Sequence, residues 1–269
     1  MKSYEGTKHL TDSDHHPNHH LQRTGWRVFE PGCIAYPDAL ALQHRLVQAR
    51  KSAALDTDLL ILLEHPPVFT LGRRGGRENL RVSSDFLDKS GIPVIQAERG
   101  GNITYHGPGQ LVAYVIMDLE ASRMSVRKLV GQMEETMIRT ALTWNIRAVR
   151  NPANRGIWVD NRKMGSIGIA IRKGITYHGL ALNVDVSLDP FNWINPCGLQ
   201  SIGVTSMQRE SPSNSITMPS VQQVFKDQFE TVFNIDLAPV VRHELAKTPA
   251  IPADGRSLPP DSDRSLTGT

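Results

Sequence analysis

A stretch in the second half of the chain alternates large apolar residues with small or polar ones and is broken by two short turns. It reads GIWVDNRKMGSIGIAIRKGITYHGLALNVDV, residues 156–186, with turns at Asp160-Asn161 and at Arg172-Lys173-Gly174. A period of two is typical of β-strands, and Asn, Asp and Gly between such runs favour tight reversals. We therefore predict two or three neighbouring antiparallel strands, so at least part of the chain forms an antiparallel sheet.

Strand and helix patterns alternate through the rest of the central region. Apolar runs predict further strands, and apolar residues at helical spacing predict helices. The strands fall at residues 26–32, 58–65, 92–98 and 111–119, and the helices at 37–53, 83–91, 125–145 and 219–234. No series of βαβ units is apparent. The pattern predicts an α/β (α+β) fold with a mixed, largely antiparallel sheet flanked by helices.

The two ends of the chain differ in composition from this centre. Residues 1–22 are polar and hold five of the ten histidines, which we interpret as a disordered His-rich extension, with a metal-binding tract as the alternative. Residues 247–269 are rich in Pro, Ser, Asp and Gly, and we predict a disordered tail. One folded domain over residues 23–246 is left between them.

Composition excludes several classes of protein. The net charge of +3 is scattered along the chain, so we expect no nucleic-acid partner. No apolar run approaches the length of a membrane span, and the N-terminal residues lack the apolar core of a signal peptide, so we expect a cytoplasmic protein with no membrane partner. Cys33 and Cys197 lie far apart, outside any metal-binding spacing, so neither a disulfide framework nor a metal site is expected.

Glycine gathers in front of the strand at 111–119. Gly100, Gly101, Gly107 and Gly109 bracket a Thr, a Tyr and His106. Glycine lets the backbone approach a ligand closely, and a tight turn between strands would need fewer glycines. We interpret the stretch as a ligand-facing loop. It is not a phosphate loop, because neither glycine-rich nucleotide motif is present.

Two of the predicted strands have one nearly flat face. In the first, Ser166, Gly168 and Ala170 share a face opposite Ile167, Ile169 and Ile171. In the second, Gly179 and Ala181 alternate with Leu180 and Leu182, and His178 stands at the start. A flat face receives either a packed neighbouring element or an apolar substrate chain, and the pattern leaves both open.

Cys197 lies between Pro196 and Gly198, on a connection rather than in an apolar run. A cysteine there is either a buried structural residue or an accessible nucleophile. A nucleophilic thiol needs a cation or base nearby to form the thiolate at neutral pH. The candidates are Lys163, Lys173, His106 and His178, and the sequence does not rank them.

Four segments resemble the lipoyl(octanoyl) transferases of the LipB family. They are LLEHPPVFTLGRR (62–74), RGGNITYHGPGQLVAY (99–114), RKMGSIGIAIRKGITYHGLALNVDVSLDPFNWINPCG (162–198) and GVTS (203–206). The resemblance extends from about residue 26 to 237. It implies the catalytic-domain fold of the biotin and lipoate protein ligases. It also implies octanoyl (or lipoyl) transfer without a cofactor, from acyl carrier protein to a lysine of lipoyl domains, as the first step of endogenous lipoate biosynthesis. The implied acceptors are the E2 subunits of 2-oxoacid dehydrogenases and the glycine cleavage H protein.

The resemblance also implies roles for individual residues. Cys197 matches the acyl-thioester nucleophile, and Lys163 matches the lysine that lowers the pKa of that thiol. The implied substrate-binding residues are Arg99, Gly100, Gly101, Asn102, Ile103, Thr104, Tyr105, His106, Ser166, Ile167, Gly168, Gly179, Leu180 and Ala181, with His178 in support. The alternatives are an ATP-dependent ligase on the same fold and a non-catalytic acyl-binding protein.

The bare backbone and the flat strand faces together suggest a slot for a thin C8 chain. Burying about seven methylenes at roughly 0.8 kcal/mol each favours octanoyl over much shorter groups. The oxyanion would be held by backbone N–H groups or by His106. Rejection of longer chains would need a closed end to the slot, which the sequence does not locate.

Overall fold

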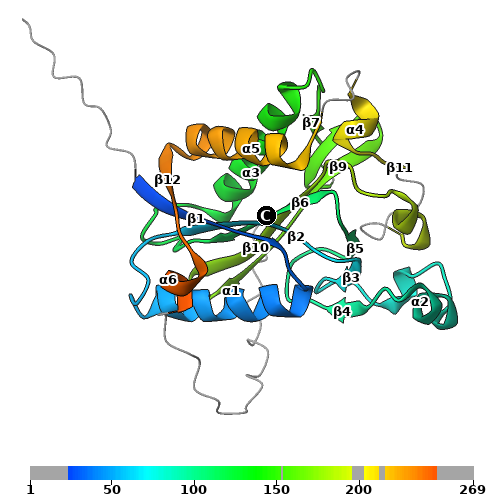
Figure 1. Ribbon diagram of the computed structural model, residues 1–269, viewed down its shortest axis with the longest axis horizontal. Helices are drawn as coiled ribbons and strands as arrows, with labels where there is room; N and C mark the ends of the chain where they lie inside the picture. The colour runs from blue at the N-terminus through cyan, green and yellow to red at the C-terminus, as the bar shows by residue number, and fades with distance from the viewer. Residues whose placement is uncertain (1–23, 153, 196–202, 212–215, 247–269) are drawn as a thin grey trace, which may run out of the picture.

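A computed structural model describes residues 24–152, 154–195, 203–211 and 216–246 (Figure 1). Among them, nine strands form one mixed sheet. In spatial order these are β12 (Ile235–Pro239), β1 (Thr24–Cys33), β2 (Leu59–Glu64), β6 (Gln110–Ile116), β10 (Ile175–Asn183), β9 (Arg162–Arg172), β8 (Gly156–Val159) and β7 (Val149–Arg150), with β11 (Gly203–Val204) paired to β9. The predicted mixed sheet is confirmed.

The predicted hairpins form the middle of this sheet. β8, β9 and β10 pair antiparallel, and β10 continues antiparallel to β6 and β6 to β2. Both turns use a left-handed residue, Asp160 at φ 51° and Lys173 at φ 52°. Beyond β2 the pairing becomes parallel, because β1, the helix α1 (Tyr36–Lys51) and β2 form a βαβ unit. The sequence pattern did not predict that unit.

Helices cover the two faces of the sheet (Figure 1). α3 (Val126–Leu142) and α5 (Met218–Phe233) pack on one face, where Met133 and Phe229 join Leu180 and Leu182 in the largest apolar cluster. α1 packs on the other face, against β10 and β6. Each helix presents one apolar stripe to the sheet, and burial of such stripes is the main stabilising contribution to a layered fold.

A smaller sheet lies at one end of the molecule. It has the order β4 (Val94–Gln96), β3 (Val68–Leu71), β5 (Ile103–His106). Its core forms around Phe69, Tyr105 and Phe191, next to α2 (Ser84–Ser90) and the 3-10 helices η1 (Arg77–Asn79) and η2 (Asp189–Trp193). α2 is capped at its N-terminus by Ser83, whose hydroxyl accepts the Phe86 N–H, and it ends at the left-handed Gly91. Two short helices, α4 (Met207–Glu210) and α6 (Arg242–Ala246), complete the described elements.

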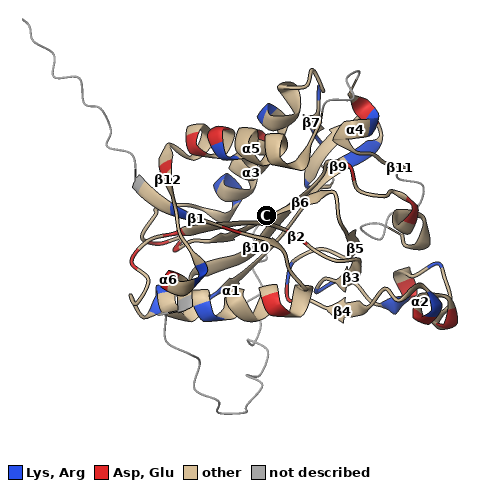
Figure 2. Ribbon diagram, viewed as in Figure 1, with Lys and Arg blue, Asp and Glu red and all other residues tan. Residues whose placement is uncertain are grey.

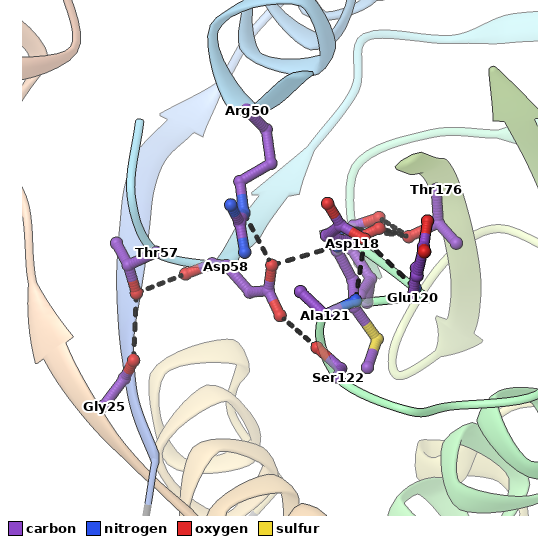
Figure 3. Close-up of polar contacts among 11 residues, drawn as sticks. Gly25, Arg50, Thr57, Asp58, Asp118, Glu120, Ala121, Ser122 and Thr176 are labelled. Carbon is purple, nitrogen blue, oxygen red and sulfur yellow. Dashed lines mark hydrogen bonds and ion pairs between the residues drawn. The ribbon is translucent and has the colours of Figure 1, made fainter. Parts of the chain in front are cut away.

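A buried carboxylate ties α1 to the sheet (Figure 3). Asp58 is 5% exposed, and its Oδ1 accepts hydrogen bonds from Arg50 Nε at 2.9 Å and from the Asp118 backbone N–H at 3.0 Å. Its Oδ2 accepts the Ser122 hydroxyl at 2.8 Å. The end of α1, the start of β2 and the turn after β6 therefore meet at one charge, and this fixes α1 over the sheet.

Charge is distributed as the sequence suggests. Figure 2 shows Lys and Arg interspersed with Asp and Glu on α1, α2 and α5. In the part of the chain that the structure describes, no helix is long and apolar enough to cross a bilayer. The predicted extension at 1–22 and the predicted tail at 247–269 lie outside the described residues.

Candidate active site

A cavity of about 630 Å³ lies where β9, β10 and β6 meet the glycine-rich loop before β5. It is lined by Lys163, by His178 and by nearly every residue predicted to bind substrate. The predicted substrate-binding residues that line it are Arg99, Gly100, Gly101, Asn102, Ile103, Thr104, His106, Ser166, Ile167, Gly168, Gly179, Leu180 and Ala181. Two regions that are far apart in the sequence, residues 99–106 and 163–181, therefore meet around one space.

Tyr105 is the predicted contact that does not line the cavity. Its ring packs 5.3 Å from that of Phe69 and 5.5 Å from that of Phe191, between centroids, inside the core of the small sheet. It lies on β5, where alternate side chains point to opposite faces, so its neighbours Thr104 and His106 reach the cavity and Tyr105 does not.

The glycine-rich loop is fixed rigidly onto β9. Gly100 N–H donates to the Ile169 carbonyl at 2.9 Å, and Arg99, 9% exposed, donates from Nη2 to the Thr70 carbonyl at 2.6 Å. A Cβ on Gly168 would lie 2.9 Å from the Gly100 carbonyl oxygen. At Gly168, therefore, the backbone of a neighbouring segment packs against the flat face of β9. Of the two alternatives for that face, a packed element or a substrate chain, the first holds at this position.

Lys163 also lines the cavity, and it is buried on β9 with 5% exposure. Its ammonium donates to Asn154 Oδ1 at 2.6 Å and lies 5.3 Å from the centroid of the Trp158 ring. Gly156 has φ 124°, and a Cβ there would lie 3.1 Å from Lys163 Cε. The nearest atom to that Cβ would be the Gly165 carbonyl oxygen, at 2.1 Å, so the close approach of β8 to β9 is the main reason that glycine is required.

Lys173, another cation considered from the sequence, is exposed in the turn between β9 and β10 and does not line the cavity. His106 lines the cavity, but its ring is already bonded inside the protein. Nδ1 lies 2.6 Å from Gln110 Oε1 and Nε2 lies 3.3 Å from Thr70 Oγ1. Both ring nitrogens therefore already have partners inside the protein.

Aromatic and imidazole rings crowd the end of the cavity near α1. The ring of Tyr36 lies 5.3 Å from that of His65, 6.1 Å from that of His106 and 6.5 Å from that of His178. Burial lowers the pKa of His65 to about 4 and that of His178 to about 3. It also holds the pKa of His106 well below its ordinary value, with the other histidines and Arg99 adding to the effect. The three imidazoles are therefore neutral at neutral pH.

Sequence reasoning gave no role to Tyr36, His65 or Tyr114. His65 and Tyr114 lie within the segments that carry the family resemblance, and that is the signal that could have found them. His65 Nε2 lies 2.7 Å from the Tyr114 hydroxyl, and Tyr114 lines the cavity with Tyr36. Tyr36 belongs to no motif and reaches the site only because α1 begins there.

Cys197 lies outside the described residues. The described chain on either side is anchored, because Asn195 N–H donates to the Asn79 carbonyl at 2.8 Å and β11 pairs with Arg162 and Lys163. Val204, seven residues after Cys197, therefore pairs with the predicted catalytic lysine.

Comparison with known sequences identifies relatives over most of the chain. The sequence model of the lipoyl protein ligase A/B catalytic domain matches residues 35–230. An octanoyltransferase of Desulfotalea psychrophila is 50% identical over 182 residues, covering 67% of this chain and 82% of the relative. One from Nitratidesulfovibrio vulgaris is 45% identical over 202 residues, covering 75% and 92%.

Solved structures agree on the fold. A bipartite lipoate protein ligase from Thermoplasma acidophilum superposes with a TM-score of 0.65 at 18% identity, covering 83% of this chain and 91% of the ligase. The P. falciparum protein LipL1 in complex with lipoate gives a TM-score of 0.66 at 14% identity, covering 81% and 67%. The predicted likeness in fold to lipoate protein ligases is confirmed.

Proposed function

The chain belongs to the lipoyl protein ligase A/B catalytic-domain family, and from this we infer that it is an acyltransferase, an octanoyltransferase of lipoate biosynthesis. The observation that carries the inference is an identity of 41–50% with octanoyltransferases over 67–80% of the chain. The lipoate ligases share the fold at 14–18% identity, which is too distant to favour an ATP-dependent ligase.

The donor is an acyl carrier protein carrying an octanoyl thioester, and the acceptor is a lysine of a lipoyl domain. We propose that the acceptors include E2 subunits of 2-oxoacid dehydrogenases and the glycine cleavage H protein. The cavity supports an acyl substrate, because backbone and small side chains form much of its wall. Transfer from a thioester to an amine is downhill, so no nucleotide is needed.

In the first half-reaction, Cys197 attacks the octanoyl carbonyl. The Lys163 ammonium stabilises the thiolate, and backbone N–H groups stabilise the oxyanion of the tetrahedral intermediate. The bond between the carbonyl carbon and the Cys197 sulfur forms, and the bond to the carrier's sulfur breaks. The carrier leaves as a thiol with the proton that Cys197 gave up, and the enzyme is left as an S-octanoyl thioester.

In the second half-reaction, the neutral amine of the acceptor lysine attacks the same carbonyl. A C–N bond forms, the C–S bond to Cys197 breaks, and the amine's proton returns to the cysteine sulfur. Lys163, or a water that it holds, relays this proton. The burial of Lys163 and its hydrogen bond to Asn154 support this role, because they hold the ammonium in one place beside the cavity.

The test is intact-protein mass spectrometry after incubation with octanoyl-carrier protein and no acceptor. We expect an octanoyl mass increase on the native protein and none on Cys197→Ser. Addition of a lipoyl domain should remove the octanoyl group from the enzyme and place it on the domain. Labelling of the lipoyl domain that requires ATP, without any adduct on the enzyme, would instead identify a ligase. Binding of octanoate with no turnover would identify an acyl-binding protein.

A further inference from the structure

We propose that His178 closes the far end of the acyl slot and thereby sets the length of the acyl chain that is transferred. The proposal rests on the octanoyl transfer inferred above and assigns a specificity-determining residue to it. Three features of His178 support it. These are the conformation of its backbone, the surroundings of its ring and its distance along the sheet from Ser166.

The backbone of His178 is left-handed in the middle of a strand. Its φ is 57°, in the left-handed region, which is uncommon for residues other than glycine. In a regular strand Tyr177 and His178 would point to opposite faces, but their ring centroids are 4.8 Å apart. The unusual backbone therefore turns the His178 ring onto the α1 side of the sheet, against the cavity.

A buried side chain of α1 holds this conformation. The His178 N–H donates to Gln43 Oε1 at 2.7 Å, and Gln43, fully buried, donates from Nε2 to the Ala39 carbonyl at 3.2 Å. A strained backbone fixed by a dedicated buried partner is a feature typical of functional positions. Gln43 is thus a positioning residue for His178.

The His178 ring is placed for its shape rather than for bonding. It is 1% exposed, and neither ring nitrogen has a hydrogen-bonding partner among the described residues. Buried polar atoms are nearly always bonded, so this arrangement costs free energy. The centroids of the Tyr36 and Tyr114 rings lie 6.5 and 5.9 Å from that of His178, the first ring stacked and the second edge-on. The wall is uncharged, because burial keeps the imidazole neutral, and a neutral wall suits an alkyl end.

The distance along the sheet matches eight carbons. Ser166 pairs with Ala181, and Ile169, three residues further along β9, pairs with His178. Three strand residues span roughly 10 Å. An extended octanoyl chain, with seven C–C bonds of about 1.5 Å, spans about 9 Å. A chain whose carbonyl lies level with Ser166 therefore ends at His178, and two more methylenes would collide with the ring.

The test compares carriers loaded with octanoyl, decanoyl and dodecanoyl chains. His178→Gly removes the ring and suits the left-handed backbone, so the fold should tolerate it. His178→Asn also tolerates this backbone and shortens the side chain less. The matched control is Lys173→Gly, because Lys173 is left-handed in the same hairpin at φ 52° but exposed and outside the cavity.

We expect the ratio of decanoyl to octanoyl kcat/KM to rise about tenfold in His178→Gly, the gain from burying about two more methylenes. The rise should be smaller in His178→Asn, and Lys173→Gly should keep the native ratio. Octanoyl transfer by the native protein with unchanged ratios in both His178 variants would overturn the proposal. So would a native preference for 8-hydroxyoctanoyl over octanoyl, because the ring would then be a hydrogen-bonding partner. Absence of octanoyl transfer by the native protein itself would contradict the function and, with it, the proposal.

Discussion

Each of the two ends of the cavity holds a buried ionisable side chain, but the two side chains differ in their partners. At one end, the Lys163 ammonium donates to Asn154 Oδ1 and lies over the Trp158 ring. At the other, His178 is walled by rings, with neither ring nitrogen bonded among the described residues and with a pKa lowered to about 3 by burial. Both residues are buried, with exposures of 5% for Lys163 and 1% for His178.

The comparison shows that two buried groups on one cavity can have very different partners. Burial disfavours the charged form of an ionisable group, and partners that stabilise a cation oppose this effect. An amide oxygen and the face of an aromatic ring both stabilise a cation, and these surround Lys163. In the proposed reaction, the Lys163 end would receive the thioester and the His178 end the alkyl chain.

The largest effect is expected when the charge at the Lys163 end is removed. Lys163→Met keeps a long apolar stem and should leave the fold intact, but it loses the ammonium. Removing one preorganised electrostatic group from an active site costs about 10²–10³ in rate, so kcat/KM for octanoyl transfer should fall by at least 100-fold. The rate at which iodoacetamide alkylates Cys197 at pH 7 should fall with it.

The matched control for this prediction is Lys226→Met on α5. Lys226 does not line the cavity, and its ammonium forms an ion pair with Glu30 at 3.0 Å. Its kcat/KM should stay near the native value. A loss of less than threefold in Lys163→Met would show that the buried ammonium has no part in the chemistry.

The sequence predicts the central sheet well because its signals are local. The hairpins β8–β9–β10 follow from side-chain alternation and from turn residues such as Asp160 and Lys173. β3 and β5 were missed, because four-residue strands are specified by their partners across the sheet rather than by their own pattern. The parallel pairing of β1 with β2 is non-local in the same way.

The candidate site was predicted in part for related reasons. The glycine-rich loop and Lys163 lie in motifs that can be read along the chain. The burial of Lys163 was not predicted, because it depends on contacts with Asn154 and Trp158 that form only in the fold. Tyr36 was not predicted, because its ring lies near the histidine rings only once α1 has packed on the sheet. Local patterns therefore predicted the slot, and tertiary packing supplied its closed end.

The second prediction tests how rigidly the Lys163 end is built. In Gly156→Ala, the new Cβ would lie 2.1 Å from the Gly165 carbonyl oxygen and 3.1 Å from Lys163 Cε, at φ 124°. Backbone cannot move aside as a flexible side chain can, so we expect a loss of about 2–4 kcal/mol in the free energy of unfolding. Urea denaturation measures it.

Gly131→Ala on α3 is the control for this substitution, because a Cβ there meets nothing within 4 Å. Alanine favours a helix over glycine, so this variant should gain up to about 1 kcal/mol. Equal stabilities for the two variants would mean that β8 and β9 adjust freely around Lys163.

The smallest expected effect is on the pH dependence of stability, to which the neutral His178 imidazole contributes. The pKa of His178 is about 3 in the folded protein against an ordinary 6.5. Below pH 6.5 the unfolded chain binds a proton that the folded protein does not, so the free energy of unfolding falls as the pH is lowered toward 3. The slope is at most about 1.4 kcal/mol per pH unit for one such histidine. His178→Gly removes this contribution, so its slope between pH 6 and pH 4 should be shallower by about that amount in urea denaturation.

Lys173→Gly is the control, since it adds a glycine to the same hairpin and removes no imidazole. It should follow the native slope, to which His65 and His106 also contribute because burial lowers their pKa values as well. Parallel slopes for the native protein and His178→Gly would mean that the folded protein takes up a proton at His178 as readily as the unfolded chain. A charged imidazole would then stand at the end of the slot, where an alkyl chain could be buried only at a large cost in desolvation.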